Sequence, residues 1–475
     1  MSVDDYDITI GVEIHVQLAT KTKMFSPVET YFGAEPNTLV GPVDLGLPGT
    51  LPVPNAQAIH FGIMLGLAFN CEIADRLVFH RKNYFYPDLP KGYQISQFDE
   101  PLCGPGNFGG VRIHRVHLEE DAAKLTHAGS SGRIHDSDAS VVDFNRGGTS
   151  LAEIVTEPDI HSAEQASEWL RLLRTTVRQL GVSDVNMEEG SLRCDANISI
   201  APKGSGVLGA KTELKNMNSF RFIERGIRAE VARQAAILDA GGKVLQETLH
   251  FDPRTEAITS MRSKEDSHDY RYFPEPDMVP VAVTAEMIAK AKAAMPELPH
   301  EREARFIGLG VEQGAARQMS WQPELGDLFE EALKTDDANP KPLAALITNE
   351  LVARVGDGEL SDTKATPAAL AQLVALTAGG KVSVTGARTV LDKLHAEGGD
   401  PAAIIEAEGL GAIGGGDELT PIIQAALDAN PDVAEKLRGG DMKPIGVIIG
   451  AVMKETRGRA DGKEVTKIAR GLLGL

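Results

Sequence analysis

Residues 8–18 alternate strictly between apolar and polar side chains, and this pattern constrains the fold more than any other stretch of the chain. The run reads Ile-Thr-Ile-Gly-Val-Glu-Ile-His-Val-Gln-Leu. Because successive side chains of a β-strand point to opposite faces, the pattern predicts a strand with one apolar and one polar face. The polar face carries Glu13 and His15, a pair that suits a functional site and a solvent-facing sheet edge equally well.

Two further stretches have polar groups on a predicted strand. The alternation returns at residues 192–200, where the polar face carries Arg193, Asp195 and Asn197. Cys194 falls on the apolar face, so we interpret it as a small core side chain rather than a nucleophile. Glu153 interrupts an otherwise apolar run, where an unpaired carboxylate would be costly, and we therefore expect a ligand or a cationic partner for it.

An acidic octapeptide at residues 117–124 has three consecutive carboxylates followed, after two alanines, by a lysine. On a strand, His117, Glu119 and Asp121 would share one face, and Glu120 would point to the other. Taken alone, the octapeptide fits a solvated acidic turn. Its interpretation changes because carboxylates recur on the polar faces of other predicted strands.

Carboxylates from separate strands on one polar face predict a site for a divalent cation. Mg²⁺ takes oxygen ligands and commonly bridges substrate phosphates, which neighbouring Lys and Arg side chains would also hold. The sequence has neither a P-loop nor a Gly-x-Gly-x-x-Gly after a predicted strand, so a nucleotide would need a different cradle. Such an assembly could activate a carboxylate by phosphorylation. The carboxylates assigned to this basin are Glu13, Glu119, Glu153 and Asp195.

The chain of 475 residues exceeds what one hydrophobic core usually holds, so roughly two or three domains are expected. Up to about residue 290, predicted strands alternate with amphipathic helices, one of which opens with a capping box at Ser162. This order predicts an α+β fold with a mainly antiparallel sheet, helices on one face and an open basin on the other. Beyond Pro296 the sequence is helical in character, and the predicted domains are 1–293, 294–405 and 406–475.

The net charge of −20 argues against a chain that wraps nucleic acid over its whole surface. Residues 431–475 nevertheless carry nine Lys/Arg against six Asp/Glu. This local excess predicts a contact with an RNA backbone; the alternative is a mildly basic helical tail that touches nothing. The cations that cluster there are Lys454, Arg457, Arg459 and Lys463.

Residues 81–94 interleave three cations with four aromatic rings, and prolines and a glycine make the second half a loop. Such a run could clamp phosphates and stack a base, or its rings could simply pin the loop down.

Three scattered cysteines exclude a disulfide framework and a four-cysteine zinc site. The acidic N-terminal residues lack an apolar signal core and no run is long enough to span a bilayer, so we expect a cytoplasmic protein.

At these residues the chain resembles the B-type component family of the tRNA-dependent aspartyl/glutamyl-tRNA amidotransferases. The resemblance covers essentially the whole chain. The segments that carry it are Gly11–Leu18, Arg81–Gln97, His117–Lys124, Asp143–Asp159, Glu188–Asn197, Thr212–Phe220 and Asp266–Asp277.

The resemblance implies a first domain similar to the catalytic cradle of glutamine synthetases, followed by a helical domain and a small helical tail that grips tRNA. It implies an ATP-dependent carbon–nitrogen ligase that phosphorylates the side-chain carboxylate of mischarged Glu-tRNA(Gln), Asp-tRNA(Asn) or both. Ammonia, released from glutamine by a glutaminase partner (the A component), then displaces the phosphate, and a small third partner (the C component) completes the heterotrimer. ATP and Mg²⁺ are the implied cofactors, and no membrane is involved.

The resemblance also assigns residues. The implied metal ligands are Glu13, His15, Glu119, Glu153 and Asp195. The implied catalytic residues are Glu13, Glu119, Glu120, Glu153 and Asp195, and contacts to the nucleotide or phosphate are expected from Lys82, Lys124, Arg193 and Asn197. Many relatives bind structural zinc through a Cys-x-x-Cys pair where this chain has Gly41 and Asp44, so zinc is not expected here.

Two other functions compete with this interpretation. One is a non-catalytic tRNA-binding scaffold of the same complex, whose acidic basin is vestigial. The other is a stand-alone carboxylate–amine ligase, which would form an amide from free glutamate without tRNA.

Overall fold

The computed structural model describes residues 3–128, 139–215, 217, 219–263, 270–335, 338–356, 360–413, 416–456 and 458–474. The chain forms two compact units, Met1–Leu298 and Pro299–Leu475. The predicted assignment of three domains stays a prediction.

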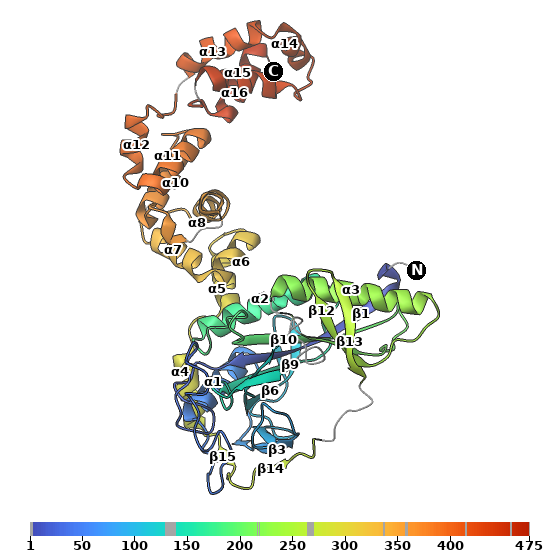
Figure 1. The fold of residues 1–475 in the computed structure, drawn as a ribbon. Coiled ribbons are helices and arrows are strands. Elements are labelled where there is room, and N and C mark those ends of the chain that lie inside the picture. Colours follow the sequence, from blue (N-terminus) through green and yellow to red (C-terminus); the bar gives the residue numbers. More distant parts are fainter. Residues whose placement is uncertain are drawn as a thin grey trace. The chain divides into compact units, whose positions relative to one another are not determined.

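An eight-stranded sheet organises the first unit (Figure 1). Neighbouring strands run antiparallel except β11 and β12, which are parallel. This confirms the predicted α+β class with a mainly antiparallel sheet. In spatial order the strands are β13 (Ala257–Ser263), β12 (Glu247–Asp252), β11 (Thr212–Lys215), β10 (Leu192–Pro202), β1 (Tyr6–Gln17), β9 (Ser150–Thr156), β6 (Val111–Glu120) and β5 (Gly106–Phe108).

Four helices of this unit contribute to one continuous apolar core with the buried side of the sheet. They are α1 (Ala56–Ala68), α2 (Ala163–Gln179), α3 (Phe220–Asp239) and α4 (Ala285–Ala294). Ser162 caps α2 as predicted, because its hydroxyl accepts a hydrogen bond from the Gln165 amide at 3.0 Å. Figure 1 shows α2 and α3 running along the sheet. The apolar side chains predicted for β1, such as Val12 and Ile14, are buried in this core, so the polar side chains face the other way.

Three small sheets complete the described part of the first unit. β3 (His80–Asn83) pairs on one side with β4 (Tyr93–Ser96) and on the other with β14 (Phe273–Pro274). β2 (Arg76–Leu77) pairs with β15 (Val281–Ala282), and β7 (Lys124–Ala128) pairs with β8 (Ala139–Asp143).

The second unit is helical where the structure describes it and contains two separate apolar cores. The first core is built from α5 (Pro299–Gly308), α6 (Gln313–Trp321), α7 (Pro323–Leu333), α8 (Pro340–Ala345), a π-helical segment (Leu346–Leu351), α9 (Val352–Val355), α10 (Pro367–Ala378), α11 (Val384–Glu397) and α12 (Pro401–Ala407). The second is built from α13 (Gly416–Asp428), α14 (Pro431–Arg438), α15 (Ile445–Glu455) and α16 (Gly462–Leu473). Two 3₁₀ turns lie at Val3–Asp5 and Leu360–Asp362. In the described ranges, every helix is too short or too polar to cross a bilayer.

Candidate active site

The sheet register places charged and imidazole side chains in one row across four adjacent strands. His15 of β1 lies opposite Arg193 of β10 on one side and opposite Glu153 of β9 on the other. Glu153 in turn lies opposite His117 of β6. Directly paired residues of an antiparallel sheet share a face, so these side chains all project from the polar face.

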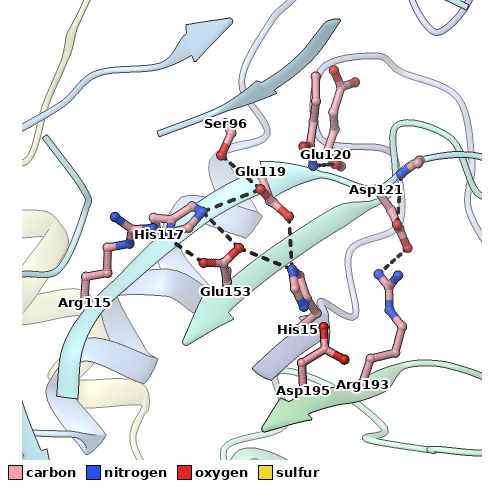
Figure 2. A network of polar contacts seen from close by, with 12 residues as sticks. His15, Ser96, Arg115, His117, Glu119, Glu120, Asp121, Glu153, Arg193 and Asp195 are labelled. Atoms are coloured by element: carbon pink, nitrogen blue, oxygen red, sulfur yellow. Dashed lines mark hydrogen bonds and ion pairs between the residues drawn. The ribbon is translucent and has the colours of Figure 1, made fainter. Parts of the chain in front are cut away.

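His15, His117, Glu119 and Glu153 form a compact cluster on that face (Figure 2). The Nε2 atom of His15 lies 3.3 Å from Glu153 Oε2 and 3.6 Å from Glu119 Oε1. The Nε2 atom of His117 lies 3.7 Å and 3.5 Å from the same two carboxylates. Each carboxylate therefore faces both imidazoles. We call these four residues the cluster.

The carboxylates of the cluster are buried, with Glu119 3% and Glu153 7% exposed. Removing such a group from water costs several kcal/mol unless positive partners surround it. Burial raises the pKa of Glu119, but its hydrogen bond with His117 and the charges of His117 and His15 together outweigh this effect, so the pKa is lowered overall. Burial also raises the pKa of Glu153, but the charge of His117 and the hydrogen bond with His15 are stronger and lower the pKa overall.

Two further titratable groups at this site, His15 and Glu13, respond to the same negative charge. Burial lowers the pKa of His15, but its hydrogen bond to Glu153 and the charge of Glu119 raise it to about 9. Burial and the neighbouring charge of Glu153 raise the pKa of Glu13. The imidazoles and cations of the site thus stabilise the ionised carboxylates of Glu119 and Glu153, whereas Glu13 beside them keeps a raised pKa.

Two groups of side chains have ligand atoms close enough to share one ion. They are Glu13, His15 and Glu153, and His117, Glu119 and Glu153, with all ligand atoms of each group within 4.8 Å of one another. The donor set combines carboxylate oxygens, which suit Mg²⁺, with imidazole nitrogens, which also accept other divalent ions. The residues present therefore fit a divalent cation, and Glu153 belongs to both groups.

Asp195 of β10 lies opposite Glu13 of β1, but its carboxylate forms an ion pair with a lysine of this chain. Lys215 of β11 approaches Asp195 Oδ2 at 2.6 Å and Glu213 Oε1 at 3.2 Å. Burial lowers the pKa of Lys215, but these two carboxylates are stronger and raise the pKa overall. The structure therefore places Asp195 beside the cluster, on the flank of Glu13.

The two acidic residues that follow Glu119 leave the cluster. Glu120 points away, where it forms an ion pair with Lys91 and accepts a hydrogen bond from the Ile95 amide at 2.9 Å. Asp121 lies just beyond the end of β6 and binds the Arg193 guanidinium at 2.8 Å. The predicted separation of Glu119 from Glu120 is confirmed in its geometry, whereas the catalytic role of Glu120 stays a prediction.

A cavity of about 260 Å³ opens on the polar face next to Glu13. Gly11 of β1 contributes no side chain to it, and Asn197 of β10 and Lys211 lie in its wall. The hydroxyl of Ser199 also borders the cavity and has no hydrogen-bond partner among the described residues. This cavity thus offers polar groups to a ligand that reaches the cluster from the β10 side.

The remaining predicted residues of the first unit lie at different distances from the cluster. Burial lowers the pKa of Lys82, but Glu119 and Glu153 raise it above its ordinary value, so its ammonium lies within electrostatic reach of the cluster. Lys124 is exposed on β7, where it pairs with Asp143 of β8. No described contact brings Lys124 to the cluster.

In the predicted tail site, Lys454 lies in the last turn of α15 and Lys463 in the first turn of α16, and both side chains are exposed. Arg459 is half-buried, and its Nε donates to the Thr456 carbonyl at 3.1 Å. Arg457 lies outside the described residues, as do residues 266–269 of the resembling segment 266–277.

Some residues of the site were not predicted as such. His117 was noted only as a neighbour of Glu119, although its place on the same face was the signal that could have identified it. Arg115, two residues earlier on that face, approaches Glu153 at 3.7 Å. Ser96 donates to Glu119 at 2.9 Å from a different sheet, and the sequence holds no signal for that contact.

At Gly41 and Asp44, where zinc is not expected, a buried ion pair holds the loop. Lys23 is 1% exposed and its Nζ lies 3.2 Å from Asp44 Oδ2. The other oxygen of Asp44 accepts from Ser26 at 2.8 Å, and the Gly41 amide donates to Oδ2 at 2.8 Å. The fit for zinc is poor because Gly41 offers no side-chain ligand. The expected absence of zinc stays a prediction.

Comparison with known proteins identifies the family. A sequence model of the GatB/GatE catalytic domain matches residues 8–289, and one of the GatB domain matches residues 327–473. Relatives named as the B component of aspartyl/glutamyl-tRNA(Asn/Gln) amidotransferase include proteins of Frankia casuarinae, 46% identical, and Persephonella marina, 44% identical. Each alignment covers 99% of this chain, and 96% and 100% of the respective relative. The resemblance predicted from the motifs is therefore confirmed, and the chain belongs to the GatB family.

Proposed function

We propose that this chain is the ligase component of a tRNA-dependent amidotransferase. It would phosphorylate and then amidate the side-chain carboxylate of Glu on tRNA(Gln), of Asp on tRNA(Asn), or of both. The observation that carries the proposal is the intact cluster of His15, His117, Glu119 and Glu153, in a chain that matches relatives of that name from end to end.

The cation site has a defined place in this proposal. Mg²⁺ would be held by Glu13, His15, Glu119 and Glu153, with Asp195 beside them. When bound, the ion supplies positive charge to the phosphates of ATP. The cavity beside Glu13 would take the nucleoside of ATP, because it opens next to the metal ligands and borders Asn197 and Lys211.

The reaction follows in two balanced steps. An oxygen of the substrate carboxylate attacks the γ-phosphorus of ATP, the bond to the β-phosphate oxygen breaks, and an acyl phosphate and ADP result. Ammonia then attacks the acyl carbon, the bond from that carbon to the phosphate-bearing oxygen breaks, and a proton of the ammonia passes to the departing phosphate, so that an amide and hydrogen phosphate result. Lys82 would orient the negatively charged substrates through its ammonium. The buried side chains around the cluster would keep water from the acyl phosphate.

The proposal includes partners. The names of the relatives describe one component of a larger enzyme, and we infer that this chain assembles with a glutaminase partner and a small third partner in the cytoplasm. The cations Lys454 and Lys463 would contact the tRNA backbone, together with Arg459 and Arg457.

Reconstitution of the complex with both partners tests the proposal. The assay supplies ATP, glutamine and either Glu-tRNA(Gln) or Asp-tRNA(Asn), and measures ADP release and amide formation. Glu119→Gln should abolish both signals. The matched control is Glu157→Gln, which changes a more exposed carboxylate bound to His114 at 2.8 Å and should retain activity.

The same assay separates the competing functions. Unchanged amidation by the Glu119→Gln complex would support a non-catalytic scaffold. Amide formation from free glutamate without tRNA would support a stand-alone ligase. A comparison of the two mischarged tRNAs decides which of them the complex uses.

A further inference from the structure

Four aromatic rings stand together beside Lys82, and we call them the aromatic wall: Tyr84, Phe98, Tyr270 and Tyr272. Phe98 and Tyr272 are stacked, with centroids 4.4 Å apart and planes inclined by 12°. Tyr270 meets Tyr272 at 6.2 Å and Tyr84 at 5.9 Å, both edge to face. Phe98 is 48% exposed although Tyr272 covers one of its faces, so much of the ring is open to solvent.

The segment that supplies two of these rings is fixed to the small sheet. The Asn83 amide donates to the Tyr270 carbonyl at 2.9 Å, and its side chain donates to the Arg271 carbonyl at 2.8 Å. A few residues further along this segment, the buried carboxylate of Glu275 accepts two hydrogen bonds of 2.7 Å from the Arg81 guanidinium. The wall is therefore preorganised, and a ligand that stacks on it loses little ordering entropy.

The wall adjoins the cluster. The Lys82 ammonium lies 4.8 Å from the ring centre of Tyr270, and Lys82 also interacts electrostatically with Glu119. Ser96, two residues before Phe98, hydrogen-bonds Glu119 (Figure 2). Burial and the charges of Glu119 and Glu153 raise the pKa of Tyr272, although Lys82 lowers it, so this phenol lies within electrostatic reach of the cluster. A group stacked on Phe98 would thus lie near Glu119 of the cluster.

We propose that the aromatic wall is a stacking site for the 3′-terminal nucleobase of the aminoacyl-tRNA, with Lys82 beside the 5′-phosphate of that terminal nucleotide. The inference rests on the proposed function, because the stacking site would position the aminoacyl-tRNA that is the substrate of the proposed reaction. The exposed ring of Phe98, backed by half-buried rings and an adjacent cation, suits a nucleotide, since every base has a π-face and is joined to a negatively charged backbone.

The position of the wall favours this nucleobase over the adenine of ATP. The wall lies on the small sheet of β3, β4 and β14, next to Glu119 of β6. The cavity assigned to the ATP nucleoside is lined by β1, β9 and β10, on the side of Glu13. The two substrates then approach the cluster from different sides, and the aminoacyl ester carries its side-chain carboxylate between them.

Binding to the reconstituted complex tests the inference with Phe98→Leu, which removes the ring but keeps apolar volume. Deacylated tRNA with its complete CCA end is compared with the same tRNA lacking the terminal adenosine. The wild-type complex should bind the complete tRNA roughly tenfold more tightly, and Phe98→Leu should abolish that difference. Phe98→Trp should restore it. The control is Phe273→Leu, a comparably exposed ring (42%) that faces Arg81 instead.

Kinetics supply the second arm. Phe98→Leu should raise KM for aminoacyl-tRNA and leave KM for ATP unchanged. A rise in KM for ATP alone, or an equal loss of affinity for the complete and the shortened tRNA, would overturn the inference. Neither result contradicts the proposed function, which is tested separately by whether Glu119→Gln abolishes ADP release.

Discussion

His15 and Glu153 face each other across the β1–β9 pair, with His15 Nε2 3.3 Å from Glu153 Oε2. Glu153 also faces His117 on its other side, so one buried carboxylate is shared by imidazoles from two different strands. A divalent cation held by the same atoms would compete with these contacts, which makes the pair the most direct probe of the cation site.

Replacing His15 by Gln should weaken cation binding. The change removes a nitrogen ligand from the group of Glu13, His15 and Glu153. We expect the Mg²⁺ concentration for half-maximal ADP release to rise roughly 10- to 100-fold. A Mg²⁺ titration of the reconstituted complex measures this. His114→Gln, an exposed site on the same strand as His117, should leave the midpoint where it is; an unshifted midpoint in His15→Gln would contradict the assignment.

Gly209→Ala should impair ATP binding. A Cβ at Gly209 would lie 2.1 Å from the Ile200 carbonyl oxygen, so the segment that borders the cavity must move away from β10. We expect KM for ATP to rise roughly tenfold, in line with the usual cost of overpacking. KM for aminoacyl-tRNA should not change. Gly308→Ala, where a Cβ meets nothing within 4 Å, serves as the control. Equal effects on both substrates would argue against a nucleotide cavity.

Asp44→Ala should destabilise the first unit strongly. The substitution leaves the fully buried Lys23 ammonium without its carboxylate. Breaking a buried pair from one side costs about 3–5 kcal/mol. Urea unfolding of the isolated chain measures the loss, and Glu35→Ala, a change at a more exposed position in the same region, should be nearly neutral. A loss below about 1 kcal/mol would show that the ion pair does not hold this loop.

The double variant Lys454→Ala/Lys463→Ala should weaken tRNA binding and reduce its dependence on salt. Each lost phosphate contact lowers the slope of log affinity against log salt by roughly 0.7–0.9. Binding of labelled tRNA to the complex at several salt concentrations measures this slope. Lys334→Ala, an exposed lysine paired with Glu331 in the same unit, should leave the slope unchanged. An unchanged slope in the double variant would instead indicate that the tail contacts no phosphate.

Much of the local structure was predictable because it depends on periodicity. The alternation at residues 8–18 determined which side chains of β1 enter the core, and the same rule separated Glu119 from Glu120. The cap at Ser162 determined where α2 begins. These features follow from the geometry of a single strand or helix, so neighbouring residues contain all the information.

The tertiary structure decided which of the predicted carboxylates meet. Strand order and register bring Glu153 between His15 and His117, direct Asp121 to Arg193, and leave Lys124 on a separate small sheet. It also decided that Ser96 reaches Glu119 and that Phe98 stacks on Tyr272, contacts between segments far apart in the chain. The sequence by itself determined the face on which each side chain lies, because that depends on local backbone geometry. Which faces lie side by side depends on long-range strand pairing and on the packing of one shared core, and only the folded chain determines it.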